Sequence, residues 1–149
     1  ELALRKNKPG IRIVIRFKSP AVNNNGDAVR VDHIDLIGGK VTGKVDPSSP
    51  DYTNATNPTT KVIATFTEND WREIQGWKTI IYTVKNVDDD MYFRLRGTNL
   101  APNTPYETDA QGNPLPDKLA TEHLGLDGPD EAWADLWFYS NPIFVKAAR

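Results

Sequence analysis

Three adjacent carboxylates, Asp88, Asp89 and Asp90, form the densest group of chemically capable side chains in this sequence. Hard cations such as Ca²⁺ are bound by several oxygen ligands at once, so the triplet is a candidate calcium site and Ca²⁺ the one candidate cofactor. Its spacing differs from that of an EF-hand loop, which carries ligands at alternate positions, a glycine and a terminal glutamate. A solvated hairpin tip is the alternative interpretation, and both stay open.

Two tryptophans, Trp71 and Trp133, lie next to polar turns and are candidates for a sugar-binding platform. An aromatic side chain combines a large apolar face with a polar edge, which suits the C–H face of a pyranose ring. Packing into the protein core is the alternative for each of them. Trp71 also follows Thr67, a candidate N-cap, so we expect one helical turn there that ends at Gly76.

Arg94 and Arg96 are expected on the same outward face of one strand, where they could hold an anion bidentately. Such arginines more commonly pair with carboxylates on a neighbouring strand, and Asp135 is the partner that we expect. The only histidines, His33 and His123, are interpreted as isolated surface residues. Since there is no cysteine either, the sequence predicts no catalytic residues.

The 149 residues fit one domain that spans residues 1–149. The formal net charge of −2 argues against a nucleic-acid-binding protein, which normally carries a basic surplus. No apolar run approaches the roughly 20 residues that a membrane-spanning helix needs. Neither nucleic acid nor a membrane is therefore an expected partner.

Short apolar runs separated by glycine and proline predict an all-β protein, an antiparallel β-sandwich of jelly-roll or immunoglobulin-like type. About eight strands are expected, with one long proline-rich loop at residues 99–129 as the best candidate for a functional surface. In the first strand, isoleucines alternate with polar residues, which indicates one buried face. The expected strands cover residues 11–18, 31–37, 40–45, 61–67, 77–85, 91–98, 134–139 and 143–145.

Two further features complete the predicted sandwich. Gly38 and Gly39 are expected to form the turn of a hairpin between residues 31–37 and 40–45. The closing segment, residues 134–145, carries large side chains at successive positions and is interrupted at Pro142. We therefore expect a central strand that is buried on both faces.

Three segments, residues 35–41, 91–98 and 134–145, resemble in order and separation the C-terminal β-sandwich of secreted bacterial phosphoesterases of the polymerase-and-histidinol-phosphatase (PHP) superfamily. The resemblance implies that this chain, which starts at Glu1 rather than at methionine, is the C-terminal piece of a longer secreted or periplasmic protein. The catalytic domain of that protein would hydrolyse phosphoesters with divalent metals held by His, Asp and Glu. No catalytic residue is carried over to this chain.

Two hypotheses follow for the function. On the resemblance, the chain is a non-catalytic accessory domain that stabilises or orients its partner, the catalytic domain of the same polypeptide. On the residues alone, the alternative is a carbohydrate- or calcium-binding module on the same sandwich. That module would use the acidic triplet, the two tryptophans and the two arginines named above.

Overall fold

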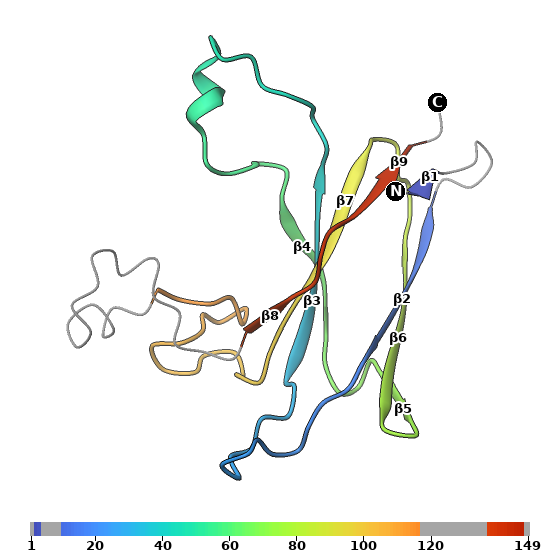
Figure 1. Cartoon of the computed structure of the whole chain (residues 1–149), viewed down its shortest axis with the longest axis vertical. Helices are drawn as coiled ribbons and strands as arrows, with labels where there is room; N and C mark the ends of the chain where they lie inside the picture. The colour runs from blue at the N-terminus through green and yellow to red at the C-terminus, as the bar shows by residue number, and fades with distance from the viewer. Residues whose placement is uncertain (1, 4–9, 117–136, 148–149) are drawn as a thin grey trace.

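The chain folds into a β-sandwich, as its sequence pattern predicts (Figure 1). The computed structural model describes residues 2–3, 10–116 and 137–147, and every structural statement below concerns these residues. The six-stranded sheet has the order β1-β9-β7-β3-β4, with β8 also paired to β7, and the three-stranded sheet has the order β2-β6-β5. Except for the parallel pair of β1 and β9, neighbouring strands are antiparallel.

Most strands lie close to where the alternation predicts them, but β1 and β5 were not predicted and the strand expected at residues 40–45 is not formed. They are β1 (Leu2–Ala3), β2 (Ile11–Phe17), β3 (His33–Lys40), β4 (Lys61–Phe66), β5 (Arg72–Ile74), β6 (Trp77–Val84), β7 (Met91–Thr98), β8 (Trp137–Tyr139) and β9 (Ile143–Lys146). A single 3-10 turn, η1 (Pro50–Thr53), lies in the loop between β3 and β4, which reaches away from both sheets (Figure 1).

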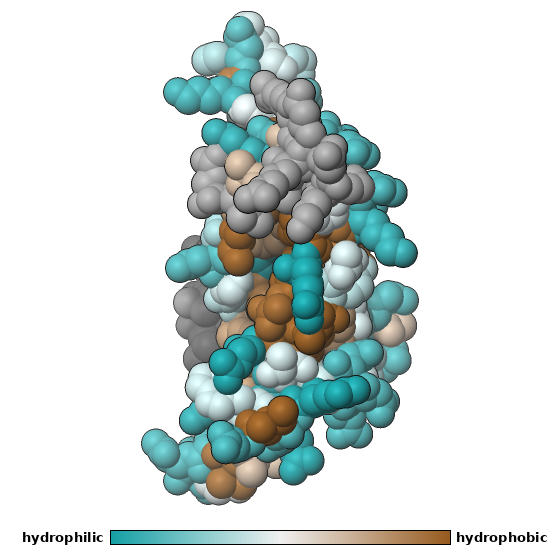
Figure 2. All heavy atoms as spheres, turned by 90° about the vertical axis from the view of Figure 1, so that its right-hand side faces the viewer, coloured by the Kyte–Doolittle hydropathy of each residue, from teal (hydrophilic) through white to brown (hydrophobic). Residues whose placement is uncertain are grey.

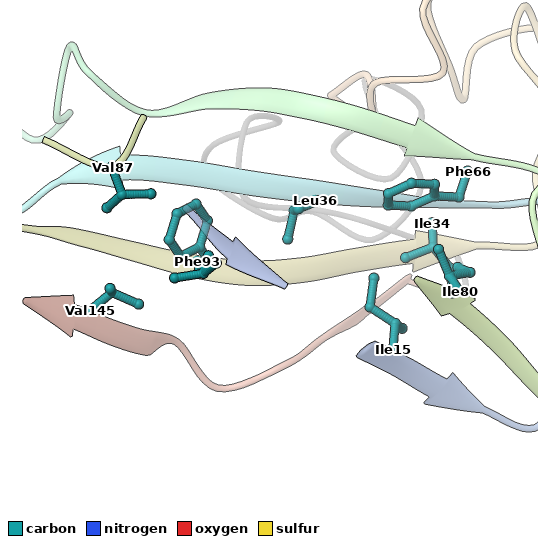
Figure 3. Close-up of a cluster of buried hydrophobic side chains, with 9 residues drawn as sticks. Ile15, Ile34, Leu36, Phe66, Ile80, Val87, Phe93 and Val145 are labelled. Atoms are coloured by element: carbon teal, nitrogen blue, oxygen red, sulfur yellow. The ribbon is translucent and has the colours of Figure 1, made fainter. Parts of the chain in front are cut away.

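The hydrophobic core lies between the two sheets (Figure 3). In β2, Ile11 and Ile15 point into it while Arg12 and Arg16 point outward, which confirms the predicted amphipathic strand. Burial of each large aliphatic side chain contributes about 1.5–3 kcal/mol to stability, so the facing strands hold the sandwich together. The buried members are Ile11, Ile15, Ile34, Leu36, Phe66, Ile80, Val87, Phe93 and Val145.

Gly38 and Gly39 lie inside β3, so the predicted hairpin turn and the strand at residues 40–45 are wrong. They pair with Phe93 and Tyr92 of β7. A β carbon on Gly39 would lie 2.7 Å from Cε1 of the Tyr92 ring. Glycine is needed here because an aromatic side chain of the neighbouring strand lies against the backbone, a role that glycine has within strands as well as in turns.

Trp71 precedes a strand rather than lying in a helical turn, so that prediction is also wrong. The capping groups do bond to each other, since Thr67 N donates to Asp70 Oδ2 at 2.9 Å, but they close a turn that leads into β5. Gln75 (φ 52°) and Gly76 (φ 74°) then form the two-residue connection from β5 to β6. Positive φ at both positions is the requirement of a type I′ hairpin turn.

The closing segment lies to one side of β7, where β8 has no further neighbour among the described strands and β9 is followed only by the two-residue strand β1. β8 and β9 follow one another along the same side of β7, interrupted at residues 140–142 as predicted. Phe138, Tyr139, Ile143 and Phe144 remain partly exposed, so burial on both faces is wrong for the described part of this segment. By register, Phe138 and Ile143 lie on the core side of the sheet, opposite Gly97 and Phe93, whereas Tyr139 and Phe144 lie on its outer face.

We predict that Gly97→Ala destabilises the protein, because a β carbon there would collide with the Phe138 ring of β8. Overpacking of this kind costs about 1–3 kcal/mol. Urea denaturation of the wild type and the variant measures the change in the free energy of unfolding.

The control is the double variant Gly97→Ala with Phe138→Ala, which removes the ring. The cost of the added methyl group should be smaller in this background, since contacting residues couple energetically. An equal cost with and without the ring would contradict the proposed contact.

Candidate functional site

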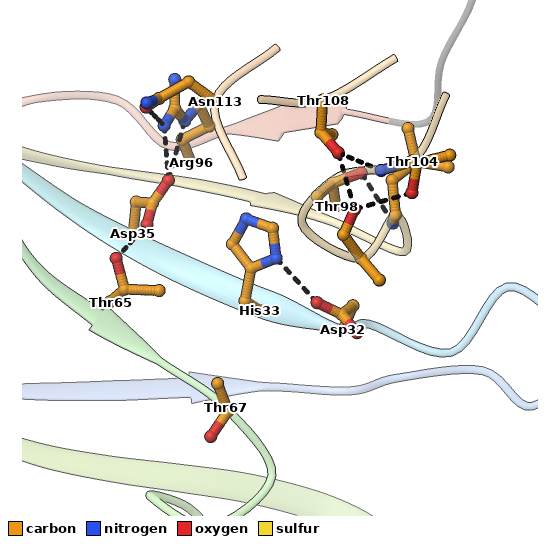
Figure 4. A network of polar contacts seen from close by, with 12 residues as sticks. Asp32, His33, Asp35, Thr65, Thr67, Arg96, Thr98, Thr104, Thr108 and Asn113 are labelled. Atoms are coloured by element: carbon orange, nitrogen blue, oxygen red, sulfur yellow. Dashed lines mark hydrogen bonds and ion pairs between the residues drawn. The ribbon is translucent and has the colours of Figure 1, made fainter. Parts of the chain in front are cut away.

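A polar network covers the face of the six-stranded sheet that points away from the core (Figure 4). Strand alternation places His33 and Asp35 of β3 on this face, beside Arg96 and Thr98 of β7. His33 is only 2% exposed and Asp35 only 1%. Burial is unexpected for an outer face, and it arises because the segment at residues 99–116 folds over it.

The centre of the network is an ion pair between neighbouring strands. Asp35 and Arg96 lie directly opposite in the register of β3 and β7. Arg96 donates to Asp35 Oδ2 from Nε at 3.0 Å and from Nη2 at 2.6 Å, and Thr65 Oγ1 donates to Oδ1 at 2.6 Å. Because both carboxylate oxygens are satisfied, the buried charge is compensated.

Arg96 therefore has a carboxylate partner on a neighbouring strand, Asp35, whereas the predicted partner Asp135 lies outside the described residues and stays a prediction. Arg96 is buried instead of open to solvent, and its guanidinium lies 5.3 Å from the ring centroid of Trp137. Arg94 lies 4.7 Å from the Tyr139 ring. Arginines of β7 and aromatic rings of β8 thus alternate in cation–π contacts on this face.

His33 is buried, so its interpretation as a surface residue is wrong. Its Nδ1 lies 2.8 Å from Asp32 Oδ1, and Nε2 has no hydrogen-bond partner within the described part of the chain. Gly112 approaches the ring so closely that a β carbon there would lie 2.9 Å from His33 Cε1. Strand alternation alone could not reveal this burial, because the covering segment follows much later in the sequence.

The first part of the long loop, residues 99–116, is held by hydrogen bonds within the loop and to β7. Thr108 Oγ1 donates to the Ala101 carbonyl oxygen at 2.6 Å, and Asn113 Oδ1 accepts from Arg96 Nη2 at 2.8 Å. Hydrogen bonds from the Asn113 side chain and backbone lower the pKa of the Asp109 carboxyl. This part is therefore a folded cover over the sheet, and residues 117–129 lie outside the described residues.

A polar cleft of about 760 Å³ opens beside this network, with Asp32 contributing to both. Trp71 lies in its wall, packed edge-to-face on Phe17 at 5.2 Å between ring centroids. Asn99 also lines the cleft, and its Oδ1 atom is buried with no hydrogen-bond partner among the described residues. The lining residues are Arg30, Val31, Asp32, Thr67, Glu68, Asn69, Trp71, Glu73, Lys78 and Asn99.

Trp71 is half-buried, since it also packs against the core, and Lys78 Nζ lies 5.9 Å from its ring centroid. It is therefore one wall of a cleft rather than a fully exposed platform. Trp133, the second predicted platform residue, lies outside the described residues. The polar cleft itself was not predicted, because its lining comes from four separated parts of the chain.

The acidic triplet lies on the connection from β6 in one sheet to β7 in the other, so it is not a hairpin tip. Asp89 Oδ2 lies 2.6 Å from Lys40 Nζ, and this hydrogen-bonded ion pair raises the pKa of Lys40. Asp90 Oδ1 accepts from Ala147 N at 2.9 Å. Within the described ranges, no three His, Cys, Asp or Glu side chains are grouped to hold a metal, and the calcium interpretation rests on the sequence alone.

Comparison of the chain with protein-family models, curated proteins and solved structures found no match. In residues 2–3, 10–116 and 137–147, no helix has the length and apolar character needed to cross a membrane.

We predict that Asp35→Asn lowers the free energy of unfolding by about 3–5 kcal/mol, because it leaves the Arg96 guanidinium buried without its counter-ion. Thermal and urea denaturation followed by circular dichroism measure the change. The matched control is Asp89→Asn, which removes a carboxylate from an exposed pair and should leave stability nearly unchanged. Equal effects of the two substitutions would contradict a structural role for the buried pair.

Proposed function

We propose that this chain is a non-catalytic β-sandwich domain that packs beside a metal-dependent phosphoesterase domain of the same polypeptide and stabilises or orients it. The observation that carries the proposal is the position of the three segments that resemble the PHP-superfamily sandwich. Most of residues 35–41 belong to β3, residues 91–98 are β7, and the described part of residues 134–145 forms β8 and β9. These strands are neighbours in one sheet.

The three segments also contact one another through side chains that depend on each other. Asp35 of the first segment pairs with Arg96 of the second. Gly97 of the second makes room for Phe138 of the third. Short matches that arise by chance need not fit together in space, so this mutual packing supports the resemblance as a single structural unit.

The use of the polar groups supports an accessory rather than a catalytic role. Arg96, one of the two anion-binding candidates, donates to Asp35 and Asn113, and it is therefore occupied inside the fold. The Arg96 side chain thereby joins β3, β7 and the covering segment. A rigid sheet of this kind is suited to hold a neighbouring domain in place.

We predict that residues 1–149 alone do not hydrolyse p-nitrophenyl phosphate or bis(p-nitrophenyl) phosphate in the presence of Mn²⁺ or Zn²⁺, whereas the full polypeptide that contains them does. Release of p-nitrophenol, followed by absorbance, measures both. Turnover by residues 1–149 would refute the non-catalytic assignment. An inactive full polypeptide, loaded with either metal, would refute the phosphoesterase assignment.

A second candidate function is carbohydrate binding in the Trp71 cleft. The specific observation is that Trp71 lines the same cleft as Asn69 and Asn99, so that an aromatic residue and side-chain amides with acceptor oxygens meet in one cleft. Sugar hydroxyl groups donate hydrogen bonds to such oxygens, and an apolar wall with a few convergent polar groups is typical of small-ligand sites. The surrounding carboxylates and amides add further acceptors and donors.

Isothermal titration calorimetry with a panel of neutral oligosaccharides tests this candidate. We predict that Asn69→Ala, an exposed substitution in the cleft wall, weakens binding by about tenfold, the usual loss when a polar contact of about 1.4 kcal/mol is removed. Tyr52→Ala, an exposed aromatic substitution in the distant β3–β4 loop, is the control and should change nothing. The absence of binding heat with every oligosaccharide would refute this candidate. A separate titration with Ca²⁺ tests whether the acidic triplet binds the ion.

A further inference from the structure

The outer face of the three-stranded sheet is uncovered by any other described element. Figure 2 shows this side of the molecule, where apolar side chains gather in the middle and hydrophilic ones border them. In the register of β2 and β6, Val14 lies opposite Ile81, and Ile74 of β5 lies opposite Trp77. Val14 is 54% exposed, Ile81 56% and Ile74 70%.

We call this surface the basic face, because its charged residues are all cations. Arg12 and Arg16 lie on β2, Lys18 directly follows this strand, and Arg72 lies on β5. Arg16 and Lys18 each lie 5.0 Å from the ring centroid of Trp77, which places both beside the same exposed indole.

Carboxylates are excluded from the outward positions of these strands. The register places arginine, valine, threonine, isoleucine and tryptophan there, and the one acidic residue of the three strands, Glu73, pairs with Lys78 on the opposite side. The whole chain carries a net charge of −2. A cationic, apolar face on an acidic protein is therefore a local specialisation, and exposed apolar patches of this kind mark interaction sites.

We propose that the basic face is the docking surface for an acidic protein surface, that of the neighbouring domain in the same polypeptide. This inference rests on the proposed accessory function and adds the place and the chemistry of the contact. Positive charges around an apolar centre complement a negatively charged surface with an apolar centre of its own. Tryptophan and arginine, which meet here at Trp77 and Arg16, are the residues that most often dominate protein interfaces.

Other occupants fit less well. An anionic polymer such as a sulfated polysaccharide would use the cations and Trp77, but Val14, Ile74 and Ile81 would gain nothing from it. In a two-fold symmetric dimer, the same patch meets itself, so two copies of this chain would bring cations against cations. The aliphatic centre and the single sign of charge together favour an acidic protein partner.

Zero-length carbodiimide cross-linking of the full polypeptide tests the proposal, because it joins a lysine amine to a carboxylate only when the two are in contact. Lys18 is the lysine of the basic face that lies beside the exposed Trp77 ring. Mass spectrometry is expected to find Lys18 joined to an Asp or Glu encoded outside residues 1–149. The yield should fall as NaCl rises, because exposed charges are screened.

The triple variant Arg12→Glu, Arg16→Glu, Arg72→Glu keeps Lys18 and should lower the cross-link yield by about tenfold or more, since like charges would then face each other. The matched control reverses three exposed cations outside the three-stranded sheet, Arg30, Lys44 and Lys61, and should keep the wild-type yield. Circular dichroism melts establish that both variants are folded.

Each outcome decides between the alternatives. Cross-links of Lys18 only to carboxylates within residues 1–149, or to a second copy of them, would overturn the docking proposal. Equal cross-link yields for the two triple variants would also overturn it. Loss of the Lys18 cross-link on addition of heparin, with the arrangement of the two domains unchanged, would do the same. An active phosphoesterase without the Lys18 cross-link contradicts the docking surface alone, whereas a cross-linked but inactive polypeptide contradicts the proposed function alone.

Discussion

The buried ion pair of Asp35 and Arg96 is the constraint on which the six-stranded sheet depends. It fixes the register of β3 against β7, and Thr65 of β4 completes the carboxylate shell. Arg96 also donates to Asn113, so the same charge pair anchors the covering segment at residues 99–116. A buried charge that loses its partner is strongly destabilising, and every element in contact with this pair is therefore held to one arrangement.

Close approach of aromatic rings to glycine shapes the same sheet. Tyr92 lies against Gly39, and Phe138 lies against Gly97, so three neighbouring strands fit only with these residue pairs. The outer face of this sheet is covered by residues 99–116, which contact Arg96 and His33. The three-stranded sheet has no such cover among the described residues, and its basic face remains open. This asymmetry is in keeping with the accessory role that we propose, because it leaves one face open to a partner.

The period-two alternation of the sequence was sufficient to predict the sandwich and most strand positions. Ile11 and Ile15 alternate with Arg12 and Arg16, and the structure buries the first pair and exposes the second. Propensity could not settle Gly38 and Gly39, because glycine serves both in a turn and beneath an aromatic ring. Which role applies depends on Tyr92, a residue far along the chain.

The sequence by itself determined the all-β class, the amphipathic strands and the absence of cysteine chemistry, because these depend on local order and composition. Tertiary structure alone decided that His33 and Arg96 are buried, that Trp71 lines a cleft, and that the closing segment lies to one side of β7. Each of these facts depends on which distant segment covers a given face. Strand alternation predicts that the two faces of a strand differ in polarity, but long-range packing decides which segment covers each face.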